Sequence, residues 1–135
     1  MTPGPDLRLA EAQAARAAAE KVRALCLHVL AQSPEAVAFR RLLLFANVKV
    51  GNHAGATATY DRLPPDQAER EHDLAKLTRS FLCRGDYTGF IRRFEALGRV
   101  SDGKLLVAAA GAYNFAGLRV QEEACQRAAL ALRPL

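Results

Sequence analysis

Hydrophobic residues recur at intervals of three and four along most of this sequence, which is the spacing of one face of an α-helix. The clearest early stripe consists of Val22, Leu25, Cys26, Val29 and Leu30. No glycine or proline interrupts residues 6–32, so we expect an N-terminal helical segment there. The stripe is weaker in the alanine-rich first half, which leaves open one helix, two helices or a partly mobile start.

The rest of the chain divides into short apolar segments separated by glycine and proline. These segments predict three helix pairs, over residues 35–64, 66–98 and 102–133. Alanine, leucine and arginine are abundant and β-branched runs are rare, which favours helix over strand. We therefore predict an all-α fold in a single domain over residues 1–135.

Two of the expected helix starts carry capping residues. Ser33 has the residue type of an N-cap, with Pro34 in the first turn of the helix that follows. Asp66 is followed three residues later by Glu69, which is the spacing of a capping box. These residues set the starts of the first and second helix pairs.

The glycines expected to end the first helix of each pair recur at a regular interval. Gly51, Gly85 and Gly117 are almost evenly spaced along the chain. Each follows an apolar helical segment and precedes another. A helix–turn–helix unit that repeats about every 34 residues is therefore predicted.

The middle unit resembles a tetratricopeptide repeat (TPR). Its large apolar positions, its turn and its second-helix aromatic position are matched by Leu74, Leu77, Phe81, Gly85-Asp86-Tyr87 and Phe94. The first pair adds Ala56 and Tyr60, and the last adds Tyr113 and Pro134. Phe90 departs from the family pattern, which prefers a small residue at that position.

This resemblance covers residues 18–134 and implies a right-handed α–α superhelix of about three TPR-like helix pairs plus an N-terminal helix. An irregular helical bundle is the alternative, because glycine commonly ends helices. In the family, the first helix of each pair lines a concave groove. The resemblance therefore implies that a partner is bound by Arg41, Phe45, Val48, Lys76, Arg79, Leu82, Val107, Gly111 and Asn114. For Phe45 and Val107 the alternative role is packing between neighbouring pairs.

The net charge of +5 favours acidic partners, but the basic residues are scattered and interleaved with acids, as between Asp66 and Lys76. We interpret most of them as a solvated, salt-bridged surface and expect no nucleic-acid partner. The longest dense apolar stretch, Leu42 to Ala46, is too short to cross a membrane. The start of the chain lacks the pattern of a secretory signal, and an odd set of three cysteines favours a reducing compartment. A cytoplasmic location is predicted.

No motif in the sequence indicates catalysis. The three histidines, His28, His53 and His72, lack the spacing of a zinc site. Cys26 and Cys125 lie in apolar helical segments, where a buried small side chain is the expected role. We therefore predict no enzyme activity, no cofactor and no metal ion.

The leading functional hypothesis is a protein-binding adaptor or chaperone that holds a client peptide or helix with acidic flanks. Its size and architecture are similar to those of small TPR-like bacterial secretion chaperones and assembly adaptors. One alternative is an RNA-binding helical-repeat protein of the pentatricopeptide type. The other is a structural homo-oligomer formed through terminal helices, since the last helix exposes an apolar sequence around Leu130.

Overall fold

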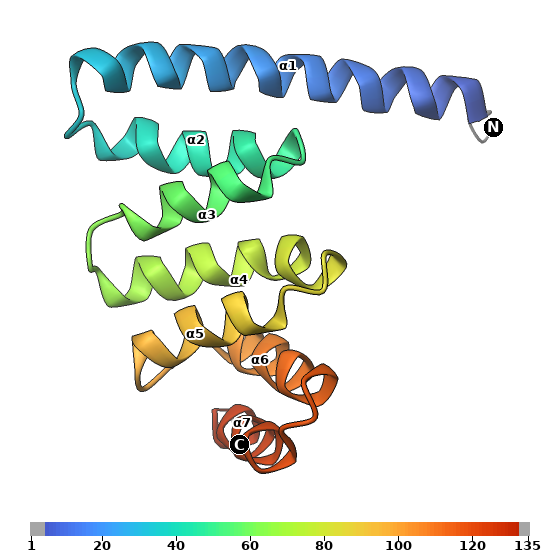
Figure 1. Cartoon of the computed structure of the whole chain (residues 1–135), viewed down its shortest axis with the longest axis vertical. Coiled ribbons are helices and arrows are strands. Elements are labelled where there is room, and N and C mark those ends of the chain that lie inside the picture. Colours follow the sequence, from blue (N-terminus) through green and yellow to red (C-terminus); the bar gives the residue numbers. More distant parts are fainter. Residues whose placement is uncertain (1–4, 133–135) are drawn as a thin grey trace. The chain divides into compact units, whose positions relative to one another are not determined.

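The computed structural model describes residues 5–132, and within this range all regular structure is helical, with no strand (Figure 1). The seven helices of this range are α1 (Pro5–Gln32), α2 (Val37–Lys49), α3 (His53–Asp61), α4 (Gln67–Cys83), α5 (Tyr87–Leu97), α6 (Gly103–Phe115) and α7 (Arg119–Ala131). The predicted all-α fold is therefore confirmed for the described residues. Residue 133, the end of the predicted last pair, and Pro134, which the family resemblance uses, lie outside them.

The chain forms two compact units that divide between Pro64 and Pro65. The first unit contains α1, α2 and α3, and the second contains α4 to α7. Paired prolines suit such a boundary, because proline lacks the amide that continues a helix and keeps the preceding residue extended. The expectation of one domain over residues 1–135 stays a prediction.

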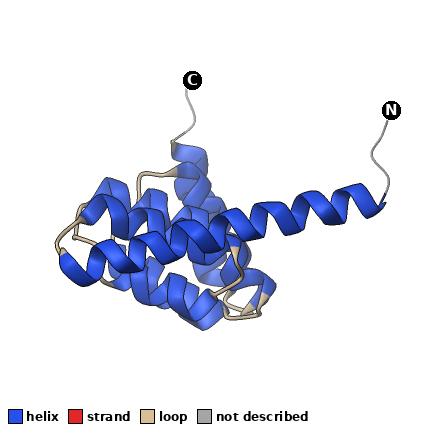
Figure 2. Ribbon diagram, turned by 90° about the horizontal axis from the view of Figure 1, so that it is seen from above, coloured by secondary structure: helices blue, strands red, loops and turns tan. Residues whose placement is uncertain are grey.

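The first unit begins with one continuous helix, α1, which packs along α2, while α2 packs against α3. Among the alternatives for the N-terminal segment, the structure therefore has a single helix. Residues 7–18 are exposed throughout, and this part of α1 extends beyond the ends of α2 and α3 (Figures 1 and 2). Burial along α1 begins at Ala19 and recurs at Cys26.

A buried amide joins the three helices of this unit. Asn47 on α2 is 3% exposed, and its Oδ1 accepts a hydrogen bond from Arg23 Nε on α1 at 2.7 Å. The same oxygen lies 3.5 Å from Asn52 Nδ2, at the start of α3. Buried hydrogen-bond acceptors are nearly always paired with donors, and Asn47 Oδ1 is paired with one donor on α1 and one at the start of α3.

The predicted cap at Ser33 is wrong. Helix α2 starts at Val37, and the N-cap residue, Ala36, makes no side-chain hydrogen bond. Pro34 lies in a separate turn, which the amide of Ala36 closes by donating to the carbonyl of Ser33 at 3.1 Å. The local turn therefore takes the place of the first helical turn that was expected there.

The first helix of each pair ends in the same way. After α4, the amide of Asp86 donates to the carbonyl of Phe81 at 3.0 Å, and the amide of Gly85 donates to that of Leu82 at 3.1 Å. This Schellman pair of bonds needs a left-handed residue, and Gly85 has φ of 70°. The equivalent glycines after α2 and α6 have φ of 77° and 76° and carry the same two bonds.

A chain of aromatic rings runs through the core of the second unit. Phe81 on α4 meets Phe90 on α5 edge to face at 5.8 Å between centroids, and Phe90 stacks on Phe94 at 6.4 Å. Phe94 then meets Tyr113 on α6 at 6.1 Å. Such pairs add about 0.5–1.5 kcal/mol each beyond their burial, so they fix the angle between neighbouring helices as well as filling the core.

Two acids that were interpreted as part of a solvated surface are buried. Glu71 and Asp73 on α4 are 5% and 1% exposed. Glu71 Oε1 accepts hydrogen bonds from the amides of Ser101 at 2.7 Å and Asp102 at 2.9 Å, just before α6. The surface interpretation is wrong for these two positions, and for Glu71 the reason is that tertiary packing brings the segment before α6 against its carboxylate.

Candidate protein-binding surfaces

A groove with a volume of about 570 Å³ runs between α4 and α6. We call it the α4–α6 groove, and its lining residues are His72, Ala75, Lys76, Thr78, Arg79, Leu82, Cys83, Asp102, Lys104 and Ala108. The α4 members recur every three or four residues, so they lie on one face of that helix. The amides of Ser101 and Asp102 donate to Glu71 Oε1 and so hold the start of α6 against the same helix.

The α4–α6 groove combines small or apolar positions with an excess of positive charge. Lys76, Arg79 and Lys104 are cationic at neutral pH, while Asp102 is the one carboxylate among the described lining residues. Asp102 is engaged as the cap of α6, because its Oδ1 accepts the amide of Lys104 at 2.9 Å and that of Leu105 at 3.2 Å. The groove is therefore suited to an anionic ligand rather than a cationic one.

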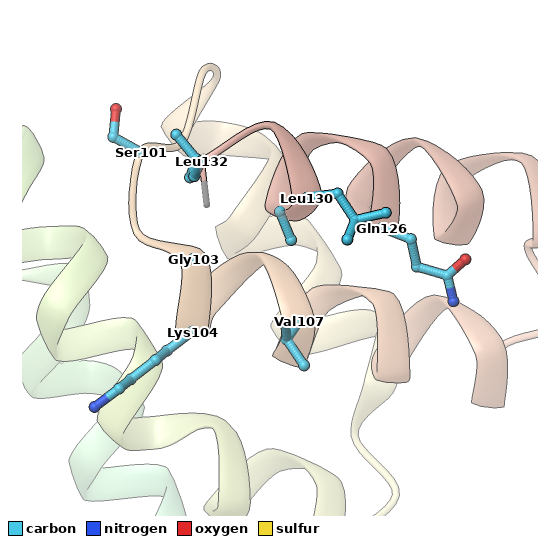
Figure 3. A pocket seen from close by; sticks show the side chains of 8 residues that line it. Ser101, Gly103, Lys104, Val107, Gln126, Leu130 and Leu132 are labelled. Carbon is cyan, nitrogen blue, oxygen red and sulfur yellow. The ribbon is translucent and has the colours of Figure 1, made fainter. Parts of the chain in front are cut away.

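A second groove, with a volume of about 910 Å³, lies between α6 and α7 (Figure 3). We call it the α6–α7 groove. It is lined by Ser101, Gly103, Lys104, Val107, Gln126, Ala129, Leu130 and Leu132.

The apolar side chains of the α6–α7 groove are unusually open to solvent. Val107 is 64% exposed, Leu130 58% and Leu132 47%. Of the described residues of α7, Cys125 alone is buried. Apolar side chains gathered around one groove are typical of a surface that binds another protein segment.

A third recess, at the turn between α6 and α7, is polar and internally bonded. Asn114 Nδ2 donates to Glu122 Oε2 at 3.2 Å, and Arg119 Nε donates to Glu123 Oε1 at 3.2 Å. These groups are exposed, and such surface pairs contribute little stability. Because its polar groups already bond one another, this recess is a weaker candidate than the two grooves.

The structure distributes the predicted α4 and α6 residues over different surfaces. Lys76, Arg79 and Leu82 line the α4–α6 groove together. Val107 lines the α6–α7 groove, and Asn114 lies in the polar recess. Gly111 lines neither of the two grooves.

The remaining predicted residues are on α2. Arg41, Phe45 and Val48 are half-buried and recur at helical spacing on that helix. They belong to the first compact unit. Their sharing one binding face with the residues of α4 and α6 stays a prediction.

The sequence interpretation missed Lys104, which lines both grooves. It is the second residue of α6 and lies three residues before Val107, so helical spacing places the two residues on the same side of α6.

The described residues include three cysteines but no cluster of metal-ligating side chains. Among residues 5–132, no three His, Cys, Asp or Glu residues lie together as metal ligands could. The cysteines are free thiols: Cys83 is exposed at the α4–α6 groove, and Cys26 and Cys125 are buried. Burial raises the pKa of the Cys26 and Cys125 thiols, which disfavours the nucleophilic thiolate.

One further titratable group has a structural role. Tyr113 on α6 donates its hydroxyl to Glu95 Oε1 on α5 at 2.8 Å. Burial raises the pKa of Tyr113 well above its ordinary value of 10.0, and the Glu95 carboxylate raises it further. The hydroxyl therefore stays protonated and joins the two helices.

Across the described residues, every helix is too short or too polar to serve as a membrane span. Comparison of the chain with models of known protein families gives no match. Comparison with curated proteins gives no significant match either.

Proposed function

We propose that this chain is a TPR-like protein-binding module, acting as an adaptor or chaperone, and that its α4–α6 groove holds a client segment. The observation that carries the proposal is the groove itself, in which Lys76, Arg79 and Lys104 surround small or apolar positions on two neighbouring helices. A short peptide or helix with apolar residues and acidic flanks matches that combination.

The TPR-like class is supported by the turn between the two helices of a pair, which recurs with similar hydrogen bonds. Besides the shared Schellman bonds, Asn52 and Asp86 cap the second helices of the first two pairs, each directly after the glycine that ends the first helix. Each accepts the amide three residues later, from Gly55 at 2.9 Å and Gly89 at 3.0 Å. In the second unit, α6 packs on both helices of the preceding pair, α4 and α5, as a stacked repeat requires.

We further propose that Arg41, Phe45 and Val48 of α2 contribute to the same binding function in a superhelix of about three pairs. When Gly51 is aligned with Gly85, Phe45 and Val48 take on α2 the positions of Arg79 and Leu82 on α4, and Arg41 takes that of Ala75, which also lines the groove. The exposed free thiol at the groove suits a reducing compartment such as the cytoplasm, where we place the protein's activity.

The proposal is tested by peptide selection on the purified full chain. A random-sequence peptide library should yield binders in which Asp and Glu flank apolar residues. Their affinity should fall about tenfold or more in a Lys76→Glu/Arg79→Glu/Lys104→Glu variant, because three attractive charges become repulsive. Arg92→Glu, at an exposed position of α5 outside the groove, serves as the charge-reversal control and should bind normally.

Two results would contradict the proposal. One is selection of peptides that bind the triple variant as tightly as the natural chain. The other is preferential binding of single-stranded RNA with an affinity that falls steeply between low and moderate salt, which would favour the pentatricopeptide alternative.

A further inference from the structure

The α6–α7 pair is open at the position where the α4–α5 pair is covered. Helix α6 packs on both α4 and α5. Phe94 of α5 meets Tyr113 of α6 at 6.1 Å, and Glu71 of α4 accepts the amide of Asp102 at 2.9 Å. One helix of 13 residues thus covers the preceding pair.

The equivalent positions of the α6–α7 pair line the α6–α7 groove. Aligning Gly117 with Gly85 places Gln126 at the position of Phe94, and Gly103 at that of Glu71. Both Gln126 and Gly103 line the groove (Figure 3). The groove therefore lies where the next helix of a stacked series would pack, and its exposed apolar residues are the ones such a helix would cover.

The same chain carries an uncovered helical segment of matching length. Residues 7–18 of α1 are helical and exposed at every position. Leu7 and Leu9 are 52% and 59% exposed. The segment continues the packed part of α1, and Leu7 and the alanines on its side of the helix stay exposed.

We propose that residues 7–18 of one copy bind in the α6–α7 groove of a second copy. Leu7, Ala14 and Ala18 lie on one face of α1, where alanine allows close approach between helices. Glu11 lies beside this face, whereas the two cations of the segment, Arg8 and Arg16, lie on other sides of the helix. Lys104 is the single charged residue among the described groove residues. The opposite charges set a preferred orientation.

A second copy is the occupant because the chain supplies both halves of the contact. Each copy has the exposed segment 7–18 and the open α6–α7 groove, so two copies that exchange segments cover all four of these surfaces. Such a reciprocal arrangement closes as a symmetric dimer, whereas a one-sided contact would propagate into longer chains. This inference is independent of client binding in the α4–α6 groove.

The first experiment measures the mass of the full chain in solution. Sedimentation at micromolar and higher concentrations should give about twice the chain mass of 14.6 kDa. Leu7→Glu and Leu130→Glu should each weaken association about tenfold or more, because each places a charge in the apolar contact. A single-chain mass at every concentration would overturn the proposal.

Matched controls separate this contact from general hydrophobic association. Leu9→Glu makes the same change on α1, about 200° around the helix from Leu7. Val120→Glu places a charge on α7 at a side chain that is 75% exposed and does not line the groove. Both controls should dimerise normally, and circular dichroism should show all four variants folded. Equal weakening by test and control variants would overturn the assigned surfaces.

Cysteine cross-linking distinguishes a second copy from a contact within one chain. In a Cys83→Ser background, an Ala14→Cys chain mixed with a Leu130→Cys chain should form a disulfide between the two chains upon mild oxidation. A chain that carries both cysteines should likewise give linked pairs. Cross-linking confined to single chains, or no cross-linking in either experiment, would refute occupation by a second copy.

Discussion

Glu71 on α4 accepts a hydrogen bond from the amide of Asp102 at 2.9 Å, although 31 residues separate them in the chain. The same oxygen accepts the amide of Ser101, and Gln67 Nε2 donates to the other carboxylate oxygen at 3.0 Å. This buried carboxylate therefore fixes where α6 begins relative to α4. Both grooves depend on that placement, since Lys104 lines each of them.

Replacing Glu71 tests this linkage. Glu71→Ala should lower the free energy of unfolding by about 2–3 kcal/mol, because two amides lose a charged acceptor in a buried site. Urea denaturation measures the change. Glu69→Ala, at an exposed position near the start of α4, should cost less than about 1 kcal/mol. Equal effects at the two positions would show that the bonds of Glu71 are not significant for stability.

Glycine substitutions should have opposite signs at two positions. Gly85→Ala should destabilise by about 1–2 kcal/mol, because φ of 70° is costly for a residue with a side chain. Gly111→Ala should stabilise by about 0.5–1 kcal/mol, because Gly111 lies inside α6 and, apart from the helix's own nearby backbone, nothing lies within 4 Å of the added methyl group. Thermal unfolding of both variants provides the comparison, and a shift of the same sign in both would contradict the assigned backbone conformations.

The hydrogen bond between Tyr113 and Glu95 predicts a pH dependence. Because the pKa of Tyr113 is raised by folding, the stability it contributes is present below pH 10 and is lost as the unfolded chain ionises above that pH. Tyr113→Phe should be about 1 kcal/mol less stable at pH 7. The difference from the natural chain should shrink as the pH rises above 10. Denaturation across this range checks the sign, and a growing difference would contradict the assignment.

The three cysteine thiols should differ in how fast they react with a thiol reagent, one reacting fast and two slowly. Cys83 is exposed, whereas Cys26 and Cys125 are buried and their pKa values are raised. An aromatic disulfide reagent at pH 8 should modify one thiol rapidly in the folded chain and all three in denaturant. The Cys83→Ser variant should lose the fast reaction. Rapid modification of two or three native thiols would show that the buried sites open readily.

Much of the fold follows from interactions between residues close in sequence. The positions of the helices come from hydrophobic spacing, and the cap at Asp66 accepts the amide of Glu69 at 3.0 Å as the capping box predicted. The turns at Gly51, Gly85 and Gly117 depend on bonds between residues only a few positions apart. Ser33 shows where such reasoning fails, because a competing local turn displaced the helix start.

The candidate site was predicted only in part. Lys76, Arg79 and Leu82 lie together because helical spacing alone places them on one face of α4. Val107 and Asn114 lie on other surfaces, since their neighbours are set by the packing of α7 on α6. Lys104 belongs to the site because of the packing of α6 on α4 and α7, which its own sequence surroundings do not encode.

By itself, the sequence determined that this chain forms short helices, where most of them end, and which helix faces are apolar, because those properties depend on backbone bonds and side-chain spacing within a few residues. Tertiary structure decided that Glu71 and Asp73 are buried and that the α6–α7 pair is left open. Burial and exposure are properties of neighbours distant in the chain, so the same residue spacing is compatible with a covered face or an uncovered one.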